Sequence, residues 1–167
     1  ELRVGAVSSG QGVPDVAGTR GQGRSGTKTG AKLSAHARKK KGYGLAGREG
    51  IDQIAIGLSG TEQMNQNNIR KSLVDTFAMA GDILARAQDD DVEIHAYLAV
   101  AFECPYEGKV ALSTVLEQVG ELMRNKPARL VIADTIGAAN PRDVNSMMSE
   151  LVSQYGPQLL GCHFPDT

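Results

Sequence analysis

The sequence predicts an α/β fold in which a parallel sheet occupies residues 42–167, behind a Gly-rich basic segment at residues 1–41. From about Gly42 onward, short apolar runs alternate with stretches whose apolar residues recur at helical spacing. Helical crossovers between apolar strands are typical of a parallel sheet with helices packed outside it. This pattern alone leaves open whether the sheet is doubly wound or a barrel.

Four segments have the short apolar character of buried strands. The second of them alternates along its length, so Ile94, Ala96 and Leu98 are expected on one face. The four predicted strands cover residues 51–58, 92–102, 130–133 and 158–163.

Three helices are predicted between these strands. The first is an amphipathic stretch. The second opens with Thr114 and Glu117 at the spacing of a capping box. The third begins after Asn140, a favoured N-cap residue, with Pro141 at its first position. The first two helices are expected over residues 72–88 and 114–124. The predicted order is therefore β-α-β-α-β-α-β.

The first 41 residues differ in character from the rest of the chain. They hold nine Lys/Arg and two acidic residues, a net charge of +7, whereas residues 42–167 carry −8. Eight glycines and few large apolar residues predict a disordered segment, one not native to the fold that follows. Its basic run at residues 38–41 is interpreted as a solvated tail, and the alternative is an arm that binds nucleic acid or another anionic surface.

Composition excludes several classes of protein. No apolar run approaches the roughly 20 residues of a membrane-spanning helix, and the N-terminus has no secretory signal. Cys104 and Cys162 are interpreted as reduced thiols. We therefore expect no membrane association and a cytoplasmic or mitochondrial-matrix location, not secretion.

Three loops follow predicted strands, at the edge of the sheet where such folds place their active sites. They are CPYEGK at residues 104–109, DTIG at 134–137 and HFPDT at 163–167. In this order they resemble the 3-hydroxy-3-methylglutaryl-CoA lyases, members of the pyruvate carboxyltransferase-like superfamily of metal-dependent TIM barrels. The resemblance covers about residues 42–167 and includes the segment from Ser59 to Ile69. It implies a partial (β/α)₈ barrel, corresponding to about strands four to seven of the family fold.

The resemblance also implies an activity, the retro-Claisen cleavage of 3-hydroxy-3-methylglutaryl-CoA to acetoacetate and acetyl-CoA by the complete enzyme. The family uses a divalent cation, Mg²⁺ or Mn²⁺, and an acyl-CoA substrate. Pro165 stands where the family has a second metal histidine, and the Arg-Asp pair of the family's first strand is not found. We therefore expect weak or absent metal binding and no activity from this fragment.

Individual residues take their expected roles from the same resemblance. Asp134 and Tyr97 correspond to catalytic positions, although Asp134 also suits a turn cap and Tyr97 suits barrel packing. Thr135 and Glu107 correspond to substrate-binding positions, with local hydrogen bonding and loop shaping as the alternatives. His163 corresponds to the first metal histidine.

Two rival functions remain open. One is a related Claisen-type acyltransferase, like isopropylmalate or homocitrate synthase. The other is a non-catalytic half-barrel interaction protein with a basic arm. Among partners we expect acyl-CoA rather than nucleic acid, and a homo-oligomer is compatible with the complete enzyme.

Overall fold

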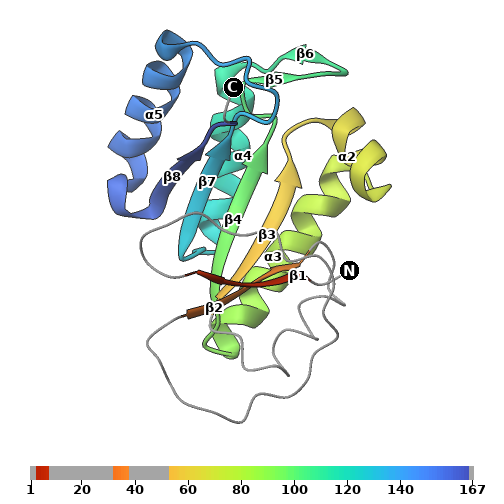
Figure 1. The fold of residues 1–167 in the computed structure, drawn as a ribbon, viewed down its shortest axis with the longest axis vertical. Coiled ribbons are helices and arrows are strands. Elements are labelled where there is room, and N and C mark those ends of the chain that lie inside the picture. Colours follow the sequence, from red (N-terminus) through yellow and green to blue (C-terminus); the bar gives the residue numbers. More distant parts are fainter. Residues whose placement is uncertain (1–2, 8–31, 38–52, 166–167) are drawn as a thin grey trace.

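The centre of the computed structural model is a six-stranded sheet in the order β1-β2-β3-β4-β7-β8 (Figure 1). The structure describes residues 3–7, 32–37 and 53–165. Strands β2, β3, β4, β7 and β8 are parallel, and β1 is antiparallel to β2. The predicted α/β class with a parallel sheet is confirmed. The strands are β1 (Arg3–Val7), β2 (Lys32–Ala37), β3 (Gln53–Ser59), β4 (Glu93–Ala99), β7 (Arg129–Ala133) and β8 (Leu160–His163).

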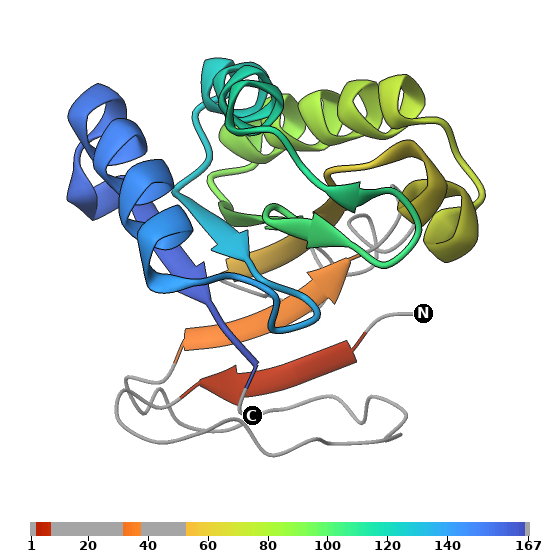
Figure 2. The same cartoon turned by 90° about the horizontal axis from the view of Figure 1, so that it is seen from above.

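The long helices of the described residues lie on one side of the curved sheet, and β1 and β2 curve away from them (Figure 2). Within the described residues, no helix combines the length and the apolar character that a membrane span requires. The long helices are α3 (Leu73–Asp89), α4 (Leu112–Arg124) and α5 (Pro141–Tyr155). Shorter elements are α2 (Glu62–Ile69) after β3 and the 3-10 turn η2 (Pro157–Leu159) before β8.

The hydrophobic core lies between the sheet and these helices. Alternate residues of β3 and β4 are buried, including Ile56 and Leu98, and they join one cluster with Leu84 of α3 and Val119 of α4. Burial of each large aliphatic side chain stabilises the fold by about 1.5–3 kcal/mol. The intervening residues, such as Tyr97, lie on the opposite face of the sheet, away from the helices.

Two of the three long helices begin at a capping side chain. Ser72 Oγ accepts a hydrogen bond from Asp75 N at 3.0 Å, and Asn140 Oδ1 accepts one from Asp143 N at 2.9 Å. The predicted Asn140 cap is confirmed. The predicted capping box at Thr114 is wrong, because α4 already begins at Leu112 and Thr114 lies inside its first turn.

Strand β4 is shorter than the predicted segment at residues 92–102. It ends at Ala99 because Val100 takes a left-handed backbone conformation, with φ of 53°. The chain then forms a small antiparallel hairpin before α4, with Gly108 at φ of 76° beyond its turn. The hairpin consists of β5 (Glu103–Cys104) and β6 (Gly108–Lys109).

The expectation that residues 1–41 form no regular structure is wrong for β1 and β2. Strand β2 adds a fifth parallel strand to the four predicted, from Ser34 opposite Gln53 to Ala37 opposite Ile56. Lys32–Ala37 alternates polar and apolar residues, and main-chain pairing with β3 stabilises so short a strand. The rest of residues 1–41, including the basic run at 38–41, lies outside the described residues.

Candidate functional site

The strands β3, β4, β7 and β8 end at one edge of the sheet (Figure 1), and the predicted site residues lie on β4 and β8 or after β4 and β7. Main-chain hydrogen bonds join neighbouring strand ends. Gly60 N donates to Ala99 O at 2.9 Å, and Asp134 N donates to His163 O at 2.9 Å. Active sites of parallel α/β folds form at this edge, because the loops there converge.

Asp134 is a buried carboxylate directly after β7, with 3% of its surface exposed. Its Oδ1 accepts a hydrogen bond from Ala138 N at 3.1 Å, and its Oδ2 accepts one from Ala139 N at 2.9 Å. Both oxygens therefore hold the loop that leads into α5, which is the turn-capping alternative considered for this residue. A catalytic role for Asp134 stays a prediction.

Thr135 links two of the strand-end loops. Its Oγ1 accepts a hydrogen bond from Val100 N at 2.8 Å, at the residue where β4 ends. This contact satisfies a backbone donor that the strand ladder no longer pairs. The local hydrogen-bonding alternative is thus seen directly, and contact of Thr135 with a substrate stays a prediction.

Tyr97 and His163 lie on the same face of the sheet, the face turned away from the helices. Tyr97 of β4 is opposite Val131 of β7, and Val131 is opposite Gly161 of β8. His163 lies two residues beyond Gly161 on β8. Strand spacing then separates the two Cα atoms by roughly 12 Å. The register supports a shared substrate-facing surface for these residues, and their roles stay predictions.

Glu107 lies apart from the other predicted site residues, in the turn of the β5–β6 hairpin. It is exposed, and its Oε1 accepts a hydrogen bond from Gln63 N at 2.7 Å, near the start of α2. On the other side of the hairpin, Lys109 Nζ lies 3.6 Å from Asp143 Oδ2 on α5. The hairpin therefore contacts the first turns of both α2 and α5.

The described residues do not fit a divalent metal ion. They contain no group of three or more His, Cys, Asp or Glu side chains placed to hold one. Such an ion takes about six ligands. Asp134 uses both oxygens on backbone donors, and Pro165 follows His163 at the position where a second ligand on the same face would stand. Of the predicted site residues that the structure describes, His163 alone remains a candidate metal ligand.

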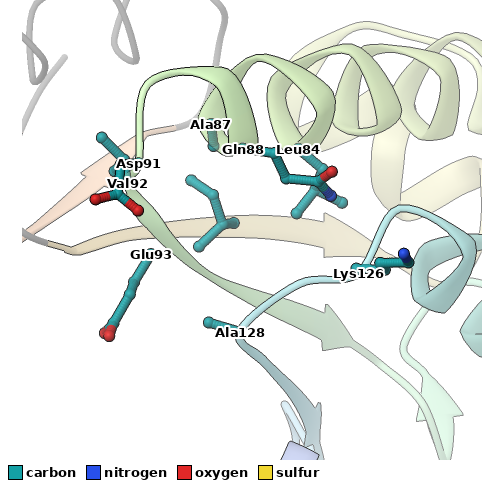
Figure 3. Close-up of a pocket in the computed structure, with 9 residues that line it drawn as sticks. Leu84, Ala87, Gln88, Asp91, Val92, Glu93, Lys126 and Ala128 are labelled. Carbon is teal, nitrogen blue, oxygen red and sulfur yellow. The ribbon is translucent and has the colours of Figure 1, made fainter.

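A pocket of about 310 Å³ lies at the opposite end of the strands (Figure 3). Leu84 and Ala87 of α3 form its apolar wall, and Glu93 and Lys126 stand at its border. It is formed where β4 begins, so it is separated from the strand ends that carry Asp134 and His163. We assign no part of the candidate site to it.

The two cysteines are expected to differ in reactivity. Cys162 is exposed, although partial burial of its thiol raises the pKa, whereas Cys104 is 1% exposed and its Sγ accepts a hydrogen bond from Thr61 Oγ1 at 3.0 Å. Because the thiolate is the reactive form, iodoacetamide at pH 8 should modify Cys162 more slowly than a free thiol, and Cys104 more slowly still. Mass spectrometry of the native protein checks this order. Faster labelling of Cys104 would contradict the structure, and unfolding in urea should remove the difference.

Comparison with known proteins assigns the chain to a family. The family model described as HMGL-like matches residues 26–167. The chain belongs to the HMGL-like family. The match includes β2, so the part of residues 1–41 from residue 26 onward belongs to the family region as well.

Several relatives of the chain are lyases. Hydroxymethylglutaryl-CoA lyase YngG of Bacillus subtilis is 30% identical over 138 residues, which are 83% of this chain and 46% of that protein. The crystal structure of the Bacillus subtilis HMG-CoA lyase matches with a TM-score of 0.79 and 28% identity, over 84% of this chain and 47% of that one. An HMG-CoA lyase from Acinetobacter baumannii, in complex with coenzyme A and 3-methylmalate, matches with a TM-score of 0.73 and 27% identity, over 77% of this chain and 42% of that one.

This member of the HMGL-like family thus spans about half the length of the relatives it matches. Its sheet and helices correspond to part of the barrel in the lyase structures, which confirms the predicted partial TIM barrel. The family is generally dependent on divalent metal ions, and curated relatives include mitochondrial and cytoplasmic forms.

Sequence reasoning missed the polar contacts that fix the end of β3. Asn65 is 1% exposed and bonds both backbone groups of Ser59, and Gln118 Nε2 of α4 donates to Gly60 O at 2.8 Å. A Cβ on Gly60 would lie 3.1 Å from Gln118 Oε1 and 3.3 Å from Ala99 O, so glycine suits this position. The family resemblance includes the segment from Ser59 to Ile69, but no apolar stripe at helical spacing indicates helix α2.

Proposed function

We propose that this chain forms part of a barrel that cleaves 3-hydroxy-3-methylglutaryl-CoA to acetoacetate and acetyl-CoA. The observation that carries the proposal is the HMGL-like match over residues 26–167, together with relatives that are themselves named as lyases of this substrate. The coenzyme A bound to a matching lyase structure supports an acyl-CoA as the substrate. The protein then works in the cytoplasm or the mitochondrial matrix.

The reaction is a retro-Claisen cleavage. A base removes the proton of the substrate's tertiary hydroxyl, the carbon–carbon bond breaks, and the electron pair forms the enolate of acetyl-CoA, which is then protonated. The negative charge that develops on the thioester oxygen requires stabilisation by fixed donors or cations. These steps need groups that converge on the substrate from several strand ends of the barrel.

We propose that the substrate lies over the face that carries Tyr97 and His163. Tyr97 supplies a hydroxyl on β4, and His163 supplies an imidazole at the end of β8, in the position of a metal ligand. Thr135 lies at the same edge, where its loop is held by Asp134. The contacts of Asp134 with Ala138 and Ala139 hold this loop, and its catalytic role stays a prediction.

We infer that the 167-residue chain alone does not cleave the substrate. Its described residues provide one candidate metal ligand, whereas the family depends on a divalent ion. The chain spans about half the length of the relatives it matches, so we propose that cleavage needs a barrel of their full length.

Product analysis tests the proposal. A longer product of the gene that contains this chain, matching the relatives in length, should release acetoacetate and acetyl-CoA from 3-hydroxy-3-methylglutaryl-CoA in the presence of Mg²⁺ or Mn²⁺. The 167-residue chain is the control and should release neither. If the longer protein instead condenses acetyl-CoA with a 2-oxo acid, it is a Claisen-type synthase and the lyase proposal is wrong.

A further inference from the structure

Helix α2 is capped from another part of the chain. Its N-cap residue, Thr61, makes no side-chain hydrogen bond to the helix, and its hydroxyl donates instead to Cys104 Sγ in the β5–β6 hairpin at 3.0 Å. The same hairpin supplies the missing acceptor, since Glu107 Oε1 receives the hydrogen bond of Gln63 N at 2.7 Å. Gln63 is the second residue of α2, a position whose N–H an N-cap side chain normally satisfies.

The capped helix in turn holds the last residue of β3. Asn65 accepts from Ser59 N and donates to Ser59 O, both at 3.3 Å, and Asn68 Nδ2 donates to Ser59 Oγ at 3.4 Å. Ser59 is opposite Ala99 in the β3–β4 register, two residues along from the Gly57–Tyr97 pair. It therefore lies on the same face of the sheet as Tyr97.

We propose that Glu107 is a positioning residue, which acts through α2 to hold Ser59 on the substrate-facing side of the barrel. This proposal rests on the proposed function, and it replaces a direct contact between Glu107 and the substrate. The chain of contacts runs from Glu107 to Gln63 at the start of α2, and from Asn65 and Asn68 within α2 to Ser59. Ser59 becomes a further residue that orients the substrate.

A cap and a charge-based substrate contact make opposite predictions for glutamine at position 107. The amide oxygen of glutamine accepts the Gln63 N–H as the carboxylate oxygen does, so Glu107→Gln retains the cap and loses only the attraction of a negative charge for the helix N-terminus. Glu107→Ala removes the acceptor altogether. A residue that binds the substrate through its charge would lose function in both variants.

Lys109 provides a matched control in the same hairpin. Its side chain is 75% exposed and its partner Asp143 is 42% exposed, so their ion pair is screened by water. Lys109→Ala therefore removes an exposed charge near Glu107 without removing a cap.

Amide hydrogen exchange of the 167-residue chain tests the contact itself. Glu107→Ala should speed exchange at Gln63 and the first turn of α2 roughly fivefold, while β4 keeps its protection. Glu107→Gln should restore most of the protection, and Lys109→Ala should match the wild type. Unchanged exchange at Gln63 in Glu107→Ala would overturn the proposal, as would loss of protection spread equally over β4.

Kinetics of the longer lyase test the consequence for the substrate. Glu107→Ala should lower kcat/KM several-fold, and Glu107→Gln should recover it. Equal losses in both variants would show that the charge of Glu107 contacts the substrate, and the positioning role would be wrong. If the longer protein has no lyase activity, the proposed function fails, while the exchange result still decides whether Glu107 caps α2.

Discussion

Replacement of Asp134 by alanine is expected to lower the free energy of unfolding by about 3 kcal/mol. The carboxylate is 3% exposed and accepts hydrogen bonds from Ala138 N and Ala139 N, and alanine leaves both donors without their partners. Their loop leads directly to Asn140, the N-cap of α5, so the start of that helix should loosen as well. Urea denaturation followed by circular dichroism measures the change.

Asn is the matched control at position 134. Asp134→Asn keeps one oxygen acceptor and places an NH₂ group toward the other backbone donor, so its destabilisation should be intermediate. If Asp134→Ala were as stable as the wild type, the two backbone contacts would contribute nothing, and the loop-holding role would be wrong.

Replacement of Leu98 by alanine is expected to destabilise the protein by about 3–4 kcal/mol. Leu98 is 0% exposed at the centre of the core between β4 and the helices, and its truncation removes apolar contacts and leaves a cavity that the sheet cannot collapse to fill. The change in the urea midpoint, with an unchanged dependence on urea, reports this loss.

Val74 gives a control for the same chemistry at the surface. It is 80% exposed on α3, so Val74→Ala should change the free energy of unfolding by less than about 0.5 kcal/mol. Equal effects of the two substitutions would mean that β4 does not pack against the helices as described.

The elements with a strong repeating pattern could be predicted from the sequence. The alternation of Ile94, Ala96 and Leu98 reflects burial of one face of β4, and the Asn140-Pro141 pair marks the start of α5 through local backbone chemistry. Both signals arise from the residues themselves. The parallel pairing of β3, β4, β7 and β8 agrees with the parallel sheet expected from the alternation of strands and helices.

The features that sequence reasoning missed depend on contacts between distant residues. Helix α2 has no apolar stripe, and its Gln63 N–H is capped by Glu107, 44 residues farther along the chain. No local sequence pattern therefore indicates this helix. The early end of β4 depends on the left-handed conformation of Val100, stabilised by the hydroxyl of Thr135. Strand β2 was not predicted, because the Gly-rich and basic composition of residues 1–41 indicated disorder more strongly than the short alternation of Lys32–Ala37 indicated a strand.

The candidate site was only partly predictable from the sequence, again because some of its contacts join distant residues. The resemblance placed Asp134, Thr135 and His163 at strand ends, and the structure puts them at one edge of the sheet. The turn-cap and local hydrogen-bonding alternatives anticipated backbone contacts of Asp134 and Thr135, but not the distant donors Val100 N and Gln63 N, whose positions only the fold determines.

One measurement tests the central claim that the face carrying Tyr97 and His163 is the substrate side of a lyase barrel. In the longer protein, the rates of acetoacetate release by His163→Ala and Cys162→Ala should be compared. Neighbouring residues of β8 point to opposite faces of the sheet. Cys162 is on the same face as Leu160, which packs in the core, and His163 is on the other face. We expect His163→Ala to lose activity on the order of 100-fold or more, and Cys162→Ala to stay near the wild type. Equal activity of the two variants would contradict the account.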